Sequence, residues 1–189
     1  MSQSFRQSQE LIESAIGQLL GSQDRPSSWV KSPESRLLTV GELNDEGVLL
    51  LRSGRRSEKS VDGIEGSPAA VVVTPAQVSS GRLSAIEAAY PDLEGDELTL
   101  PGDVLVTTMH RVRTIVDGQG GRIPSTGVYS LRVVDSGILI PEYLALMLTG
   151  DWNNRHMAGS TIPRARIRDL EIPLVPIPDQ ENVCREVRE

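Results

Sequence analysis

The sequence predicts a β-rich domain that has helical segments near both ends. Short apolar runs of valine, leucine and isoleucine recur along the chain, and seventeen glycines and twelve prolines provide turns between them. Hydrophobic residues make up 38% of the 189 residues but aromatic residues only 3%, so the core must be built from aliphatic side chains. This length is sufficient for one domain with a substantial core and accessory helices.

A helical period marks the beginning of the chain. Apolar residues between positions 4 and 20 fall at spacings of three, four and seven, and Gly21 is a suitable stop. We therefore divide the chain into an amphipathic helix at 1–22, a polar linker at 23–35, a main domain at 36–178 and the start of a second helix at 179–189. The apolar stripe of the first helix must pack on this domain or on another chain.

The main domain contains a series of expected strands. The first run, residues 37–43, predicts a strand or a turn, and further strands are expected at residues 48–51, 69–74, 104–107, 114–116 and 129–134. A Pro-Gly-Asp turn at residues 101–103 precedes the run at residues 104–107. The glycine-rich residues 117–121 predict a hairpin and lack the lysine and hydroxyl of a P-loop. Residues 140–148 predict a helix with proline in its first turn.

A short basic segment, residues 52–60, has two interpretations. Its four basic residues among serine and glycine suit phosphate contacts, and they equally suit a solvated hairpin tip.

The most informative pattern is AGSTIPRARIRDLEIPLVPIPDQ at residues 158–180. Arg164, Arg166 and Arg168 alternate, so in a strand they would project from one face. Proline cannot donate to a sheet ladder, so residues 171–178 predict an edge strand or an extended strap. Asp179 suits the N-cap of a final helix.

Net charge is −7, but its distribution is uneven. Residues 104–170 contain eight arginines and five acidic residues, a balance of +3, which leaves −10 for the remainder. An acidic body with a basic strip fits a DNA-binding protein attached to a larger partner, and it also fits an ordinary acidic protein.

The order Gly-Ser-Thr-Ile, spaced arginines, Asp-Leu, apolar-proline run and Pro-Asp-Gln resembles the end of a target-recognition domain. Such domains occur in the DNA-specificity subunits of type I restriction-modification systems and at the C-terminus of some adenine-specific DNA methyltransferases. The resemblance covers residues 36–183 and implies an α+β (α/β) fold, with a curved, mostly antiparallel sheet, short helices and helical arms at both ends. A full subunit has two recognition domains, whereas one is found here, so we expect a half-subunit, a fused module or a trimmed piece.

The resemblance also implies partners. These are double-stranded DNA, an adenine-specific methyltransferase subunit that binds S-adenosylmethionine, and, as an alternative, a second copy of the chain. Neither the Asn/Asp-Pro-Pro-aromatic motif of the catalytic subunit nor a glycine-rich cofactor motif occurs in the sequence, so we expect no cofactor and no catalysis here. The single cysteine, Cys184, excludes an internal disulfide, and no apolar run approaches the ~20 residues that span a bilayer, so we expect a cytoplasmic protein.

The candidate DNA-binding residues fall on two loops. The first carries Thr108, His110, Arg111 and Arg113, and the second carries Ser160, Thr161, Arg164 and Arg166. Arginine binds guanine edges and phosphates, and hydroxyl groups bind phosphates. Arg168 adjoins Asp169, which predicts a local ion pair. Two alternatives remain: a protein-interaction module that does not bind DNA, and the recognition segment of a single-chain methyltransferase or endonuclease.

Overall fold

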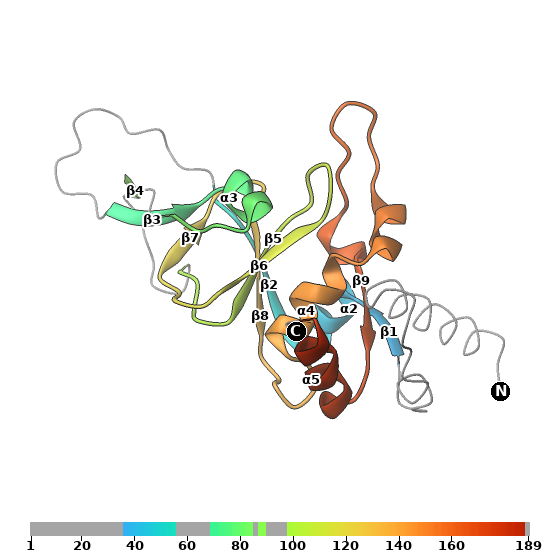
Figure 1. The fold of residues 1–189 in the computed structure, drawn as a ribbon. Coiled ribbons are helices and arrows are strands. Elements are labelled where there is room, and N and C mark those ends of the chain that lie inside the picture. The colour runs from blue at the N-terminus through green and yellow to red at the C-terminus, as the bar shows by residue number, and fades with distance from the viewer. Residues whose placement is uncertain (1–35, 56–68, 85–86, 90–97, 188–189) are drawn as a thin grey trace.

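The computed structural model describes residues 36–55, 69–84, 87–89 and 98–187, so the expected first helix and linker lie outside the described residues. The elements in chain order are β1 (Arg36–Thr39), α2 (Val40–Asp45), β2 (Leu49–Ser53), β3 (Ala69–Val73), α3 (Pro75–Ser80), β4 (Glu87–Ala89), β5 (Asp103–Thr107), β6 (Arg113–Asp117), β7 (Arg122–Pro124), β8 (Tyr129–Val133), α4 (Pro141–Leu148), the 3-10 helices η2 (Asp151–His156) and η3 (Ile167–Asp169), β9 (Glu171–Leu174) and α5 (Ile177–Glu186). Short helices combined with mostly antiparallel strands confirm the α+β class (Figure 1).

The described strands form three small sheets. An antiparallel sheet has the order β2-β8-β5-β6, a second sheet has the order β4-β3-β7 with β3 and β7 parallel, and β1 pairs with β9. The expected hairpin at residues 117–121 is wrong, because β7 leaves β6 and joins β3. Gly120 and Gly121 have φ angles of 72° and 73°, which turn the chain away from the first sheet, and glycine adopts such angles without steric cost.

Strand β5 lies at the centre of the fold and is buried over its whole length. Val104 and Val106 belong to the larger core, which also includes the buried face of α4, whereas Leu105 belongs to a smaller core with Val73 and Val78. Coverage on both faces explains the continuous apolar run of this strand.

The Pro-Gly-Asp turn before β5 is fixed by the buried carboxylate of Asp103. It accepts hydrogen bonds from Arg132 Nε at 2.9 Å, from Arg132 Nη2 at 2.8 Å and from the Leu100 N–H at 2.9 Å. The hydrogen bond with Asp103 raises the pKa of Arg132 above its ordinary value. The aspartate of this turn is therefore a structural ion-pair partner that joins β5 to β8.

Capping boxes begin two of the short helices. In α2 the Thr39 side chain accepts a hydrogen bond from the Glu42 backbone N–H, and the Glu42 side chain accepts one from the Thr39 backbone N–H. Thr74 and Gln77 form the same pair of hydrogen bonds in α3. These bonds satisfy N–H groups that have no partner in the first turn, which is important for helices of only six residues.

The last helix begins earlier in the chain than expected. Helix α5 begins at Ile177 after an N-cap at Pro176, so the expectation of an N-cap at Asp179 is wrong. Pro178 is tolerated in a first turn because its missing N–H would have no helical partner there, and Asp179 then lies near the positive end of the helix dipole. The edge strand expected at residues 171–178 is confirmed only for its first half, as β9, which pairs with β1 and leads into this helix.

Gln180 joins α5 to the loop that precedes α4. Its side chain is fully buried, donates to the carbonyl oxygens of Ile138 at 2.8 Å and Val175 at 2.7 Å, and accepts from the Ile140 N–H at 3.0 Å. The Pro-Asp-Gln motif therefore ends in a residue that connects three segments of backbone.

We expect Gln180→Ala to lower the free energy of unfolding by about 1–3 kcal/mol, because it leaves buried backbone groups without a partner. The measurement is urea denaturation. The matched control is Glu181→Ala at the neighbouring exposed position, for which a change within ~0.5 kcal/mol is expected. Equal losses in both variants would contradict a linking role for Gln180.

Candidate nucleic-acid interface

The two loops that carry the candidate residues lie side by side at one end of the molecule (Figure 1). We call residues 108–113, which end at the first residue of β6, the β5–β6 loop, and residues 157–166 the arm. The His110 N–H donates to the Pro163 carbonyl at 2.8 Å, the Ala165 N–H donates to the Thr108 carbonyl at 3.4 Å, and Met109 and Arg164 form an antiparallel bridge. Backbone hydrogen bonds thus join two segments about fifty residues apart into one surface.

The arm is closed on itself as well as on the β5–β6 loop. Ala158 and Arg164 exchange backbone hydrogen bonds of 3.0 and 2.8 Å, which leaves residues 159–163 as its tip. Gly159 has a φ of 112°, and a Cβ placed there would lie 3.1 Å from the Ile162 carbonyl oxygen. This left-handed, closely packed position explains the glycine of the Gly-Ser-Thr-Ile motif.

The base of the arm is held by Asn153, which is buried. Its amide accepts from the Glu171 N–H at 2.8 Å and donates to the Glu171 carbonyl at 3.1 Å, so it pairs with Glu171 as a neighbouring strand would. The same amide donates to the carbonyls of Met147 and Leu148, and the Trp152 indole N–H also donates to the Glu171 carbonyl at 3.0 Å. Because the arm lies between residues 153 and 171, this amide clamps both of its ends.

Sequence reasoning missed Asn153. It lies in the polar segment Gly-Asp-Trp-Asn-Asn-Arg, where an exposed and a buried asparagine cannot be distinguished without the fold. The neighbouring His156 lies with its Nε2 atom 3.7 Å from a Glu171 carboxylate oxygen, and Arg155 pairs with the other oxygen. These contacts give His156 a local polar role at the base of the arm.

His110 has an unusual backbone conformation, with a φ of 62°. The Arg111 N–H donates to the Met109 carbonyl at 2.7 Å, so the three residues form a tight turn with His110 at its centre. A positive φ costs a non-glycine residue roughly 1–3 kcal/mol, and such strain persists where the surrounding contacts fix it, often at functional sites. Here the bond to Pro163 of the arm fixes it.

The charge of this surface is of one sign. Residues 108–113 and 157–166 contain no aspartate or glutamate. They contain four exposed arginines, and within the described part of the chain these side chains form no ion pair or hydrogen bond: Arg111, Arg113, Arg164 and Arg166. In a chain of net charge −7, this is a local concentration of exposed positive charge.

Of the eight candidate residues, seven are exposed on this surface and Thr108 is buried. The contribution of Thr108 is made by its backbone: the Thr108 carbonyl oxygen accepts a hydrogen bond from the Ala165 N–H and so joins the two loops.

The expected arginine strip does not form a strand face. Arg164 lies in an isolated bridge, and Arg168 lies in η3, where the chain turns and buries Ile167. Arg168 pairs with Asp45 at 2.7 Å rather than with Asp169, and this hydrogen bond lowers the pKa of Asp45. The prediction of a local Arg168–Asp169 pair is therefore wrong, and Arg168 is separated in role from Arg164 and Arg166.

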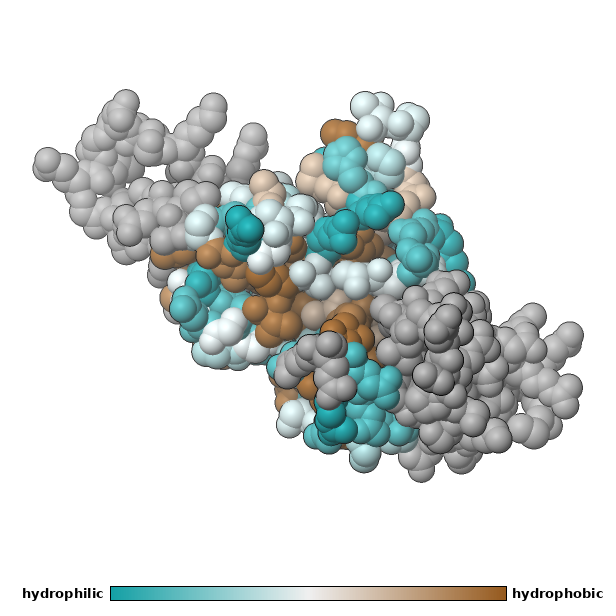
Figure 2. Space-filling view, viewed as in Figure 1, coloured by the Kyte–Doolittle hydropathy of each residue, from teal (hydrophilic) through white to brown (hydrophobic). Residues whose placement is uncertain are grey.

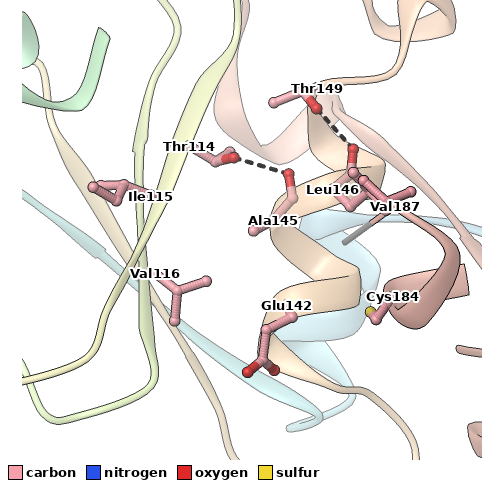
Figure 3. A pocket seen from close by; sticks show the side chains of 9 residues that line it. All are labelled: Thr114, Ile115, Val116, Glu142, Ala145, Leu146, Thr149, Cys184 and Val187. Carbon is pink, nitrogen blue, oxygen red and sulfur yellow. Dashed lines mark hydrogen bonds between the residues drawn. The ribbon is translucent and has the colours of Figure 1, made fainter. Parts of the chain in front are cut away.

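An open groove of about 370 Å³ lies elsewhere, between β6, α4 and α5 (Figure 3). Its lining is mostly aliphatic, and the Thr114 hydroxyl within it donates to the Ala145 carbonyl at 2.9 Å. Its ionisable side chains are Glu142 and Cys184. Across the ranges that the structure describes, there is no cluster of metal-ligating side chains and no helix with the length and hydropathy to cross a membrane.

No protein-family model matches the sequence, and a search of curated proteins finds no match. Solved structures, however, share the fold. A chain from a structure of the type I restriction-modification system, determined to explain its complex assembly and conformational transition, has a TM-score of 0.59 at 18% identity, over 98% of this chain and 44% of that one.

Two further structures are of named subunits. The HsdS subunit from Thermoanaerobacter tengcongensis has a TM-score of 0.58 at 17% identity, over 98% of this chain and 43% of that one. The S subunit of a type I restriction-modification system from M. genitalium has a TM-score of 0.52 at 15% identity, over 86% and 39%. The chain thus spans less than half the length of these subunits, and the resemblance to type I specificity subunits is confirmed at the level of the fold.

Proposed function

We propose that this chain is the sequence-specific DNA target-recognition module of a restriction-modification or related defence methyltransferase system, and that it has no catalytic activity of its own. The observation that carries the proposal is the joined surface of the β5–β6 loop and the arm. Four exposed arginines, which form no ion pair within the described residues and have no acidic neighbour in either segment, project there from an otherwise acidic chain. The fold shared with S subunits supports this function.

The side chains of this surface suit contacts with DNA bases and contacts with DNA phosphates. Arginine binds guanine through two hydrogen bonds in the major groove, and arginine and hydroxyl side chains bind phosphates. The hydroxyls of Ser160 and Thr161 are exposed at the tip of the arm, and His110 lies where the arm meets the β5–β6 loop. Seven side chains form the proposed interface: His110, Arg111, Arg113, Ser160, Thr161, Arg164 and Arg166.

The proposed partner is an adenine-specific methyltransferase subunit in the cytoplasm, which would bind S-adenosylmethionine and extrude the target base. Helix α5 and the N-terminal segment are the proposed contacts with that subunit or with a second copy of the chain.

A second candidate function is protein interaction without DNA binding. The observation in its favour is the apolar groove of Figure 3, at whose edge Val187 is 47% exposed. Aliphatic surface of this kind is more typical of protein contacts than of DNA contacts.

The two functions are distinguished by arginine substitutions. We expect Arg164→Ala and Arg166→Ala to weaken DNA binding without unfolding the domain. Each lost phosphate contact should reduce the slope of log K against log salt by about one unit on every sequence, whereas a lost guanine contact should cost roughly 1–3 kcal/mol on the cognate site. The measurement is fluorescence anisotropy at several salt concentrations, on cognate and scrambled duplexes, with the methyltransferase partner present.

Arg168→Ala is the matched control, because this arginine is occupied by Asp45. Its effect on DNA affinity should be smaller than that of either other variant. If all three variants bind DNA as the parent does, the arginines form only a solvated surface, and protein interaction becomes the better proposal.

A further inference from the structure

The tip of the arm exposes an aliphatic side chain where a DNA contact surface would ordinarily be polar. Ile162 is 41% exposed, and in the chain it follows Ser160 and Thr161, which are exposed, and precedes Pro163 and the exposed Arg164. In Figure 2 a small apolar patch is visible at the end of the arm, among hydrophilic surface. Single exposed aliphatic residues are common on protein surfaces, so exposure alone does not assign a function to Ile162. Its position at the tip of the arm and its rigid backbone are the further evidence.

The backbone around Ile162 is constrained from both directions. The next residue is Pro163, whose ring fixes its own φ and restricts the residue before it to extended conformations. The Pro163 carbonyl accepts from His110, and the Ile162 carbonyl packs closely on Gly159. Isoleucine itself has few accessible χ1 rotamers because it is branched at Cβ. The tip therefore presents a stiff apolar side chain rather than one that can fold back onto the surface.

From this geometry we propose that Ile162 is an apolar wedge that enters the base stack of bound DNA at one base step. The inference rests on the proposed function. Isoleucine is one of the side chains that DNA-bending proteins insert between base pairs, at a cost of a few kcal/mol per unstacked step. Arg164 and Arg166 follow Ile162 in the arm and would supply phosphate contacts that offset this cost.

The wedge has a functional consequence for the assembly. A methyltransferase must extrude its target base, and extrusion costs least where stacking is already weakened. A wedge on the recognition module would therefore lower the cost of base extrusion by the partner subunit, in addition to holding the register of the complex.

The test compares DNA affinity for an intact cognate duplex with that for duplexes in which one mismatch is moved stepwise through the site. A mismatch at the wedged step removes the unstacking cost, so the wild-type chain with its methyltransferase partner should bind one of these duplexes about tenfold or more tightly than the intact one. Ile162→Ala should reduce this preference to about twofold or less, and Ile162→Leu should retain it. Ile138→Ala is the control, since Ile138 is 37% exposed in a different loop.

A second readout uses 2-aminopurine placed at the preferred step. Its fluorescence should rise on binding of the wild type and not on binding of Ile162→Ala. Should Ile162→Ala bind no duplex, the shorter Ile162→Val decides: a preference below that of the wild type supports the wedge, and an unchanged preference overturns it.

The remaining outcomes separate the two proposals. If the wild type binds none of the duplexes, the proposed function fails and the wedge fails with it. If it binds DNA but Ile162→Ala keeps the mismatch preference and the fluorescence change, only the wedge is overturned. If the wild type is indifferent to mismatches and loses affinity when one thymine is replaced by uracil, while Ile162→Ala does not, Ile162 lies on a thymine methyl group, which also overturns the wedge.

Discussion

Replacing Asp117 by alanine is expected to lower the free energy of unfolding by about 3–5 kcal/mol, because it removes one partner of a buried ion pair. The Asp117 side chain is fully buried at the end of β6 and pairs with Arg122, whose side chain is 13% exposed. It also accepts hydrogen bonds from the Thr99 hydroxyl at 2.7 Å and from the N–H groups of Gln119 and Gly120 at 3.1 and 3.0 Å. The substitution leaves these donors without an acceptor and the guanidinium without a counter-ion.

The measurement is urea denaturation of Asp117→Ala beside Asp169→Ala. Asp169 is exposed in η3, so its loss should change the free energy of unfolding by no more than ~0.5 kcal/mol. The double variant Asp117→Ala/Arg122→Leu should recover part of the loss, since it removes the unpaired charge as well. A double variant as unstable as the sum of both single variants would show that the pair itself does not carry the effect.

The sequence predicted the elements whose cause is local. Strands β3, β5 and β8 and helix α4 lie within one or two residues of their expected bounds. β3, β5 and α4 contain apolar runs bounded by proline, glycine or polar residues, β8 alternates apolar with polar residues, and α4 begins at the proline that marked its first turn. The resemblance to type I specificity subunits added the α+β class, which the shared fold confirms.

The sequence did not predict features that depend on distant partners. The expected hairpin after β6 is a crossing between two sheets, because the partner of β7 is β3, about fifty residues earlier in the chain. The alternation of Arg164, Arg166 and Arg168 indicated a strand, but burial of Ile167 and pairing of Arg168 with Asp45 favour a 3-10 turn there. The local periodicity of a sequence does not show that β7 pairs with β3 or that Arg168 pairs with Asp45.

The same distinction applies to the candidate interface. The residue types of the two loops indicated the arginines, His110, Ser160 and Thr161 as candidate DNA contacts. Sequence reasoning placed them on two loops, and the structure joins those loops through the backbone of residues 108–110 and 163–165. Thr108 is buried within that joint, which a pattern of exposed polar residues does not reveal. Whether the seven exposed residues contact DNA remains a prediction.

Asn153 links stability to the proposed recognition function, because its amide closes the base of the arm. Asn153→Asp has nearly the same shape, but it replaces the amide donor by a carboxylate that faces the carbonyl oxygens of Met147, Leu148 and Glu171. We expect the free energy of unfolding to fall by about 3–5 kcal/mol, as for an uncompensated buried charge. Urea denaturation measures this loss. Asn154→Asp, the same substitution at the adjacent exposed residue, should change it by no more than ~0.5 kcal/mol.

The arm should respond more strongly than the sheet. At a temperature at which Asn153→Asp remains folded, hydrogen exchange of the amides of Ala158, Arg164 and Ala165 is expected to accelerate, because their bonds lie within the segment that Asn153 closes. The amides of β5 should keep their protection, since that strand is buried on both faces and pairs on both edges. DNA affinity should fall with the protection of the arm, because loosened arginines lose the fixed geometry that base contacts require. If the amides of the arm and of β5 lose protection together, Asn153 supports the whole domain and does not specifically position the arm.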